Sequence, residues 1–148
     1  MRVLRPGDDL SELQPQSVFL AGPTPRSEKV ASWRPDAFAE LQNAGFDGDI
    51  LAPEPFFGSY ETQTVWEYRG LENCGVVCFW VPRDLEDLPG FTTNVEFGRY
   101  VGSGRCLYGR PPGAPKTRYL DWLYGHVCGQ KPIDVLSELM RRAVKWLR

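Results

Sequence analysis

Apolar residues gather in four short runs that contain few polar positions. The longest, GVVCFWVP at residues 75–82, shows no alternation of polar and apolar residues, which is typical of a strand covered on both faces. The run SVFLAG at 17–22 ends in glycine and proline, as expected where a central strand enters a loop. Residues 50–53 and 105–111 complete the set. The pattern therefore predicts four buried strands.

Between and after these runs the apolar residues recur at helical intervals. In the segment SWRPDAFAELQNAGF the spacing is that of one helical face, and Gly45 suits the position just beyond a helix end. The residues of that face are Trp33, Ala37, Phe38, Leu41 and Ala44. The other predicted helices cover residues 61–74, 92–104, 119–124 and 133–148. The last has an apolar stripe that fits either its own sheet or a neighbouring subunit.

This order of elements predicts one α/β domain over residues 1–148. Strands that alternate with helices favour a doubly wound, flavodoxin- or Rossmann-like parallel sheet of four to five strands with helices on both faces. In such sheets ligands bind beyond the carboxyl ends of the strands. The loops at residues 21–27, 53–60, 82–94 and 109–115 are therefore the candidates for a binding site.

Composition narrows the choice of partners. The chain has a formal net charge of -2 with dispersed basic residues, which disfavours nucleic acid as a partner. It has neither a run of about 18 apolar residues nor the apolar core of a signal peptide, so we expect a cytoplasmic protein without membrane contact. The four cysteines form no CxxC pair and His126 is the only histidine, so no metal site is expected. Cys78 and Cys106 are predicted to be small buried hydrophobes, and Trp33, Trp66 and Trp80 to be core residues.

Glu96 has two interpretations. Thr93-Asn94-Val95-Glu96 matches a capping box, in which the threonine and the glutamate satisfy the N-terminus of a helix. The same segment follows the most buried strand, where a functional site is expected. Gly98 is then expected to open space beside the carboxylate. Both interpretations stay open from the residues alone.

A second acid and a polar loop are predicted near the same edge. Glu67 lies four positions before Leu71, so on a helix it shares a core-facing stripe and needs a partner or a task. In the loop GPTPRS, Gly22 and Pro23 precede Thr24 and Arg26, whose donors suit a phosphate or a hydroxyl group. The alternative is an ordinary proline-stiffened turn. The loop is neither a Walker loop nor GxGxxG, and no cofactor is expected.

Five segments occur together in an order that resembles the nucleoside 2-deoxyribosyltransferase-like family. They are VFLAGPTPR, SWRPDAF, WEYRGL, CFWVPR and TTNVEFGRYVGSGR, between about Val18 and Tyr119, and the last resembles a branch of the family with TTNxEFG. The resemblance implies a homo-oligomer with shared active sites that cleaves the N-glycosidic bond of nucleosides or nucleotides. It also implies that Glu96 attacks the anomeric carbon and that Glu67 stands where familiar members carry an aspartate.

The resemblance extends the expected site and leaves its reaction open. Asn94 offers a donor and an acceptor to a base, and Thr93 and Gly98 are expected beside it. Two carboxyl groups flanking an anomeric carbon suit a double displacement through a covalent sugar ester. Transfer of 2-deoxyribose to another base is the first hypothesis. The alternatives are a nucleoside 5'-monophosphate N-glycosidase that uses water, and a domain that senses nucleotides without catalysis.

Overall fold

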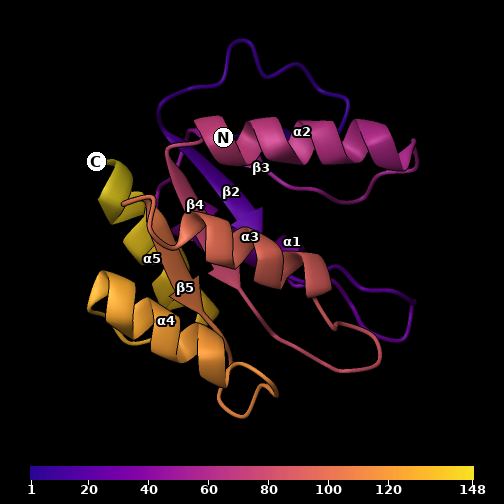
Figure 1. Cartoon of the computed structure of the whole chain (residues 1–148). Helices are drawn as coiled ribbons and strands as arrows, with labels where there is room; N and C mark the ends of the chain where they lie inside the picture. The colour runs from indigo at the N-terminus through magenta and orange to yellow at the C-terminus, as the bar shows by residue number, and fades with distance from the viewer.

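The computed structural model describes residues 1–148 as a five-stranded parallel sheet with helices on both faces (Figure 1). The strand order is β1-β3-β2-β4-β5. The strands are β1 (Arg2–Leu4), β2 (Ser17–Ala21), β3 (Asp49–Leu51), β4 (Val76–Trp80) and β5 (Cys106–Gly109). The helices are α1 (Arg34–Asn43), α2 (Tyr60–Asn73), α3 (Phe91–Tyr100), α4 (Arg118–Cys128) and α5 (Leu136–Leu147). The predicted doubly wound fold is confirmed.

The two central strands explain the absence of alternation in the sequence. Every residue of β2 and β4 is buried. Phe19 and Phe79 point into a core shared with α2, α3 and α4, whereas Leu20 and Cys78 point into a second core shared with α1 and α5. Both faces of these strands are therefore covered by helices, as the uninterrupted apolar runs predict.

The C-terminal helix packs against its own sheet. Its apolar stripe packs against α1, β4 and β5: Leu139, Met140 and Ala143 are fully buried, and Leu136 and Leu147 at the two ends are partly buried. Of the two arrangements that the sequence allows for this helix, packing on its own sheet or against a neighbouring subunit, the structure shows the first. The expected core tryptophans, Trp33, Trp66 and Trp80, are all buried, as are Cys78 and Cys106. No helix has the combination of length and apolar character that crossing a membrane requires.

The strand order creates a switch point between β2 and β4. From β2 the chain crosses through α1 to β3 on one side, and from β4 it crosses through α3 to β5 on the other. Connections that leave neighbouring strands in opposite directions open a crevice at the carboxyl ends of those strands. The topology therefore places a ligand site beyond Ala21 and Trp80, between α2 and α3.

Helix α3 begins three residues earlier than a cap at Thr93 would place it, and this corrects the capping interpretation. The residue before the helix is Gly90, with φ of 66°, and no side chain caps the helix N-terminus. Thr93 is the third helical residue and Glu96 the sixth, so neither is placed to bind the free amide groups of the first turn. The capping-box interpretation of Thr93 and Glu96 is wrong.

Candidate active site

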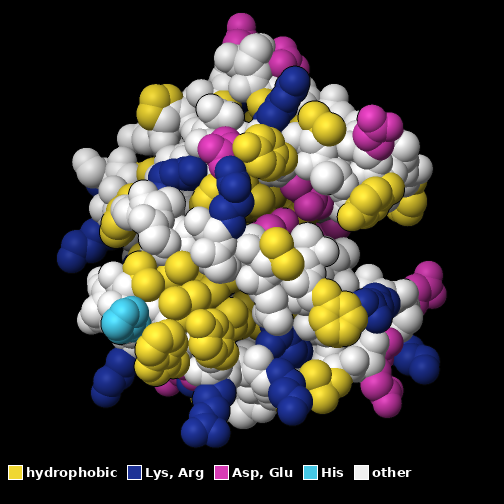
Figure 2. Space-filling model, in the orientation of Figure 1, with side chains coloured by type: hydrophobic (Ala, Val, Ile, Leu, Met, Phe, Trp, Pro, Cys, Tyr) yellow, Lys and Arg dark blue, Asp and Glu magenta, His cyan; other side chains and the backbone are white.

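A cavity of about 530 Å³ lies at this crevice. Its floor comes from the end of β2 and the loop after it, and its walls come from α2 and α3. Figure 2 shows the hollow between α2 and α3, with acidic side chains at its bottom. Glu67 from α2 and Glu96 from α3 both line the cavity. The structure thus brings together the two acids that the sequence singled out.

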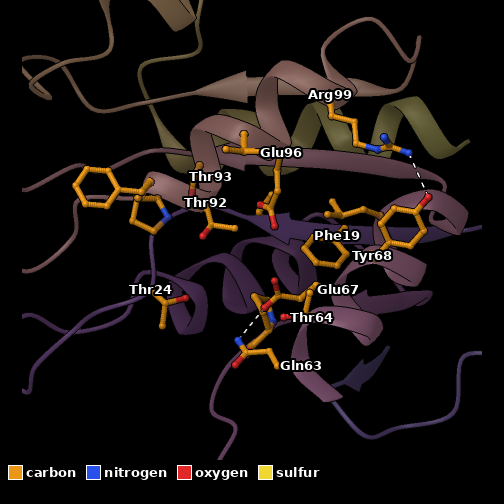
Figure 3. Close-up of a pocket in the computed structure, with 18 of the residues that line it drawn as sticks. Phe19, Thr24, Gln63, Thr64, Glu67, Tyr68, Thr92, Thr93, Glu96 and Arg99 are labelled. Carbon is orange, nitrogen blue, oxygen red and sulfur yellow. Dashed lines mark hydrogen bonds between the residues drawn. The ribbon is translucent and has the colours of Figure 1, made fainter. Parts of the chain in front are cut away.

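The two carboxyl groups point toward each other from opposite walls (Figure 3). Glu67 Oε1 accepts a hydrogen bond of 2.8 Å from Nε2 of Gln63, one turn earlier on α2. No protein group donates a hydrogen bond to the carboxyl group of Glu96, so its oxygen atoms are available to a ligand. Thr93 lies one turn before Glu96 on α3 and also lines the cavity.

Burial raises the pKa of both acids, and repulsion by the charge of Glu67 adds to the shift of Glu96. Desolvation is the main cause for each, and the charge of Glu67 raises the pKa of Glu96 further, to about 8. The hydrogen bond from Gln63 and the positive charge of Arg34 act in the opposite direction on Glu67. A pKa of about 8 favours the protonated form of Glu96 near neutral pH, so the pair can supply an acid to a reaction there.

Arg34 is a site residue that the sequence analysis missed. Its side chain is completely buried, and it donates to the carbonyl groups of Leu20 and Gly22 at 3.1 and 2.9 Å. It also donates to Thr24 Oγ1 at 3.0 Å and forms an ion pair with Glu54. This guanidinium fixes the loop after β2 and supplies positive charge to both catalytic candidates. In the sequence, an arginine followed by a proline resembles the exposed first turn of a helix, so burial of Arg34 is not predictable. The one available signal is Glu54, an acid that follows a predicted strand at the same edge of the sheet and could pair with it.

The loop after β2 is held in place by close packing and by a hydrogen bond from a buried side chain. Gly22 has φ of 152°, and a Cβ atom there would lie 2.1 Å from the carbonyl oxygen of Trp80. The carbonyl of Pro23 accepts a hydrogen bond of 3.0 Å from Trp33 Nε1. Gly22, Pro23, Thr24 and Arg26 all line the cavity, as the sequence predicts.

Arg26 is the exposed cation of this loop. Its guanidinium lies 5.4 Å from the ring centre of Phe91 and forms no ion pair within the chain. Arg34, by contrast, is committed to Glu54. Arg26 is therefore free to bind an anionic group at the mouth of the cavity.

Two expected substrate contacts lie outside the cavity. The side-chain oxygen of Asn94 accepts a hydrogen bond from Arg83, which also donates to the carbonyl of Pro89 at 2.8 Å. Gly98 is exposed, and a Cβ atom there would meet nothing within 4 Å. Both residues lie two positions from Glu96 on α3. Because two positions correspond to a rotation of about 200° around the helix axis, their side chains point away from the face that carries Glu96. Asn94 therefore holds the loop after β4, and Gly98 opens no space beside the carboxylate.

The chain matches one known family. The model of the family described as "Nucleoside 2-deoxyribosyltransferase like" matches residues 15–114, which include both acids and the loop after β2. A search of curated proteins finds no match.

Proposed function

Since the chain belongs to the nucleoside 2-deoxyribosyltransferase-like family, we propose that it transfers 2-deoxyribose from one nucleobase to another. Membership indicates an activity related to glycosyl transfer, with nucleosides and nucleobases as substrates. The observation that carries the proposal is the facing pair of Glu67 and Glu96 in one cavity at the switch point of the sheet. No cofactor is part of the proposed reaction.

In the first half of the proposed reaction, the carboxylate of Glu96 attacks C1' of the sugar. The bond from C1' to the base nitrogen breaks, and the protonated carboxyl of Glu67 gives its proton to the departing base. The product is a sugar ester on Glu96. In the second half, a nitrogen of the incoming base attacks C1', Glu67 takes the proton of that nitrogen, and Glu96 leaves as a carboxylate.

The position of the shared proton must change when the substrate binds. In the free chain, the raised pKa of Glu96 and the amide donated by Gln63 favour a proton on Glu96 and a carboxylate on Glu67. The proposed attack needs the opposite arrangement. A bound substrate that donates a hydrogen bond to Glu96 and presents a base nitrogen to Glu67 favours that exchange, because each contact stabilises the required protonation state.

Base exchange tests the proposal. The protein is incubated with a deoxynucleoside and a different free base, and the products are separated by chromatography. A new deoxynucleoside is the expected product, and Glu96→Gln should abolish it while the variant keeps the fold. Release of sugar and free base without a new nucleoside would show hydrolysis instead. If the protein converts none of the nucleosides or nucleotides tested, the remaining alternative is a domain that binds them without catalysis.

A second candidate is hydrolysis of a nucleoside 5'-monophosphate, and Arg26 favours it. The guanidinium is exposed at the cavity and pairs with no carboxylate. Arginine binds phosphate through two parallel hydrogen bonds, which lysine does not reproduce. If this candidate holds, the 5'-monophosphate should be cleaved faster than the nucleoside, and Arg26→Lys should remove most of that preference. Equal rates for both substrates would exclude a phosphate site.

We also propose that the chain forms a homo-oligomer that covers the cavity mouth. The rim carries exposed apolar side chains from both walls: Tyr60 at 82%, Phe91 at 71% and Val95 at 74% exposed. Apolar groups gathered at the mouth of a site mark a surface that another molecule covers. Sedimentation velocity should therefore show a species heavier than the 16.8 kDa monomer.

A further inference from the structure

A polar cluster joins the two walls of the cavity beside the acidic pair. The hydroxyl of Tyr100 on α3 donates a 2.6 Å hydrogen bond to Glu72 Oε1 on α2. Arg99 donates to the same oxygen at 3.0 Å, and its Nε donates to the Tyr100 hydroxyl at 3.2 Å. We call Glu72, Arg99 and Tyr100 the α2–α3 clasp.

The clasp provides almost all of the direct polar contact between the two helices. Three hydrogen bonds join α2 to α3, and every one involves Arg99 or Tyr100. The third runs from Arg99 to the hydroxyl of Tyr68 at 3.3 Å, as the dashed line in Figure 3 shows. Nothing else of this kind ties one wall of the cavity to the other.

The clasp lies close to the two acids on both helices. Glu72 follows Glu67 by five positions and Tyr100 follows Glu96 by four, which corresponds to about 6–8 Å along each helix axis. Both helices are rigid over that length. A change in their separation at the clasp is therefore passed on to the two carboxyl groups.

The acidic pair needs such a restraint because two carboxyl groups in a poorly solvated cavity repel each other whenever both are ionised. The other charged groups near the pair are Arg34 on α1, which is paired with Glu54, and the exposed Arg26. Neither cation contacts either member of the pair by a hydrogen bond, so neither holds the two acids together. Residues on α2 and α3 themselves must set their separation.

We propose that Tyr100 and Glu72 are positioning residues, which hold α2 against α3 so that Glu67 and Glu96 stay at their working separation. This inference rests on the proposed function. A double displacement requires carboxyl groups about 5 Å apart, and an error of about 1 Å in such a geometry costs about 100-fold in rate.

The buried tyrosine, rather than the ion pair, is the stronger part of the clasp. The Arg99 and Glu72 side chains are 54% and 38% exposed, and exposed pairs of this kind contribute little. Tyr100 is only 4% exposed. Arg105 fixes the end of α2 beneath it by donating to the carbonyl groups of Leu71 at 2.7 Å and Cys74 at 2.9 Å.

Tyr100→Phe removes the clasp hydroxyl and keeps the buried ring. The matched control is Tyr108→Phe, since Tyr108 is also a buried tyrosine whose hydroxyl donates to a carboxylate, Asp121, at 2.8 Å. That contact joins β5 to α4 and lies outside the cavity. The first readout is the pKa of Glu96, measured by carbon-13 NMR of labelled glutamate side chains. The second is the dependence of base exchange on pH.

Tyr100→Phe is expected to lower the pKa of Glu96 toward its ordinary value, because the two carboxyl groups move apart. It should also lower kcat for base exchange at least about tenfold with a smaller change in KM, while Tyr108→Phe leaves both readouts at the parent values. Glu72→Ala breaks the same contact from the exposed side and should reproduce the shift if Tyr100→Phe does not fold. An unchanged Glu96 pKa in the folded variant, or an equal change in Tyr108→Phe, would overturn the proposal. Absence of base exchange in the parent protein would defeat the proposed function, while the NMR titration would still decide the role of the clasp.

Discussion

At the scale of single residues, the carboxyl group of Glu96 lies where burial and a neighbouring acid make its ionised form unfavourable. It is withdrawn from water, faces a second acid and receives no hydrogen bond from the chain, and its pKa rises from 4.5 to about 8. An ionised carboxyl group in this position needs a hydrogen-bond donor or a positive charge as its partner. The carboxylate form that the proposed reaction requires must therefore be stabilised by the bound substrate.

The pH dependence of stability should show this directly. An acid whose pKa is higher in the folded state binds its proton more tightly there, so its contribution is fully present below about pH 4.5 and is lost as the pH rises through about 8. The free energy of unfolding of the parent should fall between pH 5 and pH 9, relative to Glu96→Gln, by roughly 2–4 kcal/mol, a range reduced because the side chain is partly exposed. Urea denaturation at several pH values measures it. Parallel curves for the two proteins would show that Glu96 titrates normally.

At the scale of elements, two glycines in neighbouring helices have opposite environments. Gly70 on α2 faces the sheet, where a Cβ atom would lie 2.7 Å from Leu51 Cδ2 and 2.9 Å from the ring of Phe19. Gly98 on α3 faces open space. Only the first glycine is required by packing, and it lets α2 approach the sheet closely enough for Glu67 to reach the cavity.

Alanine substitution at these two glycines should therefore change the free energy of unfolding in opposite directions. Gly98→Ala is expected to stabilise the protein by about 0.5–1 kcal/mol, because alanine is the better helix former and nothing opposes its methyl group. Gly70→Ala should destabilise it by about 1–3 kcal/mol through overpacking against Leu51 and Phe19. Thermal unfolding of both variants beside the parent provides the comparison. A stabilised Gly70→Ala would mean that α2 lies farther from the sheet than described.

Most helices and strands of this fold can be predicted from the sequence, but the edge strand β1 cannot. The buried strands and the five helices are predictable because uninterrupted apolar runs and helical spacing are strong local signals. The edge strand β1 has only three residues; it pairs in parallel with β3, and an ion pair of 2.7 Å between the half-exposed Arg2 and the buried Asp49 supports that pairing. A contact across 47 positions leaves no local signal. The start of α3 was misplaced for a related reason, since Gly90 begins the helix without a capping side chain.

At the scale of the whole molecule, the sequence locates the two cavity acids better than the residues around them. Glu67 and Glu96 are predictable because each sits on an element whose carboxyl-edge position follows from the fold class. Arg34 and the clasp residue Tyr100 are not, because their roles depend on partners that only the strand order brings close. Asn94 is expected in the site from the family resemblance and from its donor and acceptor groups, whereas the helical rotation turns it toward Arg83.

The central claim is that Glu96 forms a covalent bond to the sugar while Glu67 faces it across the cavity. The most direct test is mass spectrometry of the protein after incubation with a 2-fluoro nucleoside analogue, whose glycosyl ester is hydrolysed slowly. The account predicts one sugar attached to the peptide that contains Glu96, and none in Glu96→Gln. Release of the base with the sugar on another residue, or with no sugar attached at all, would contradict it.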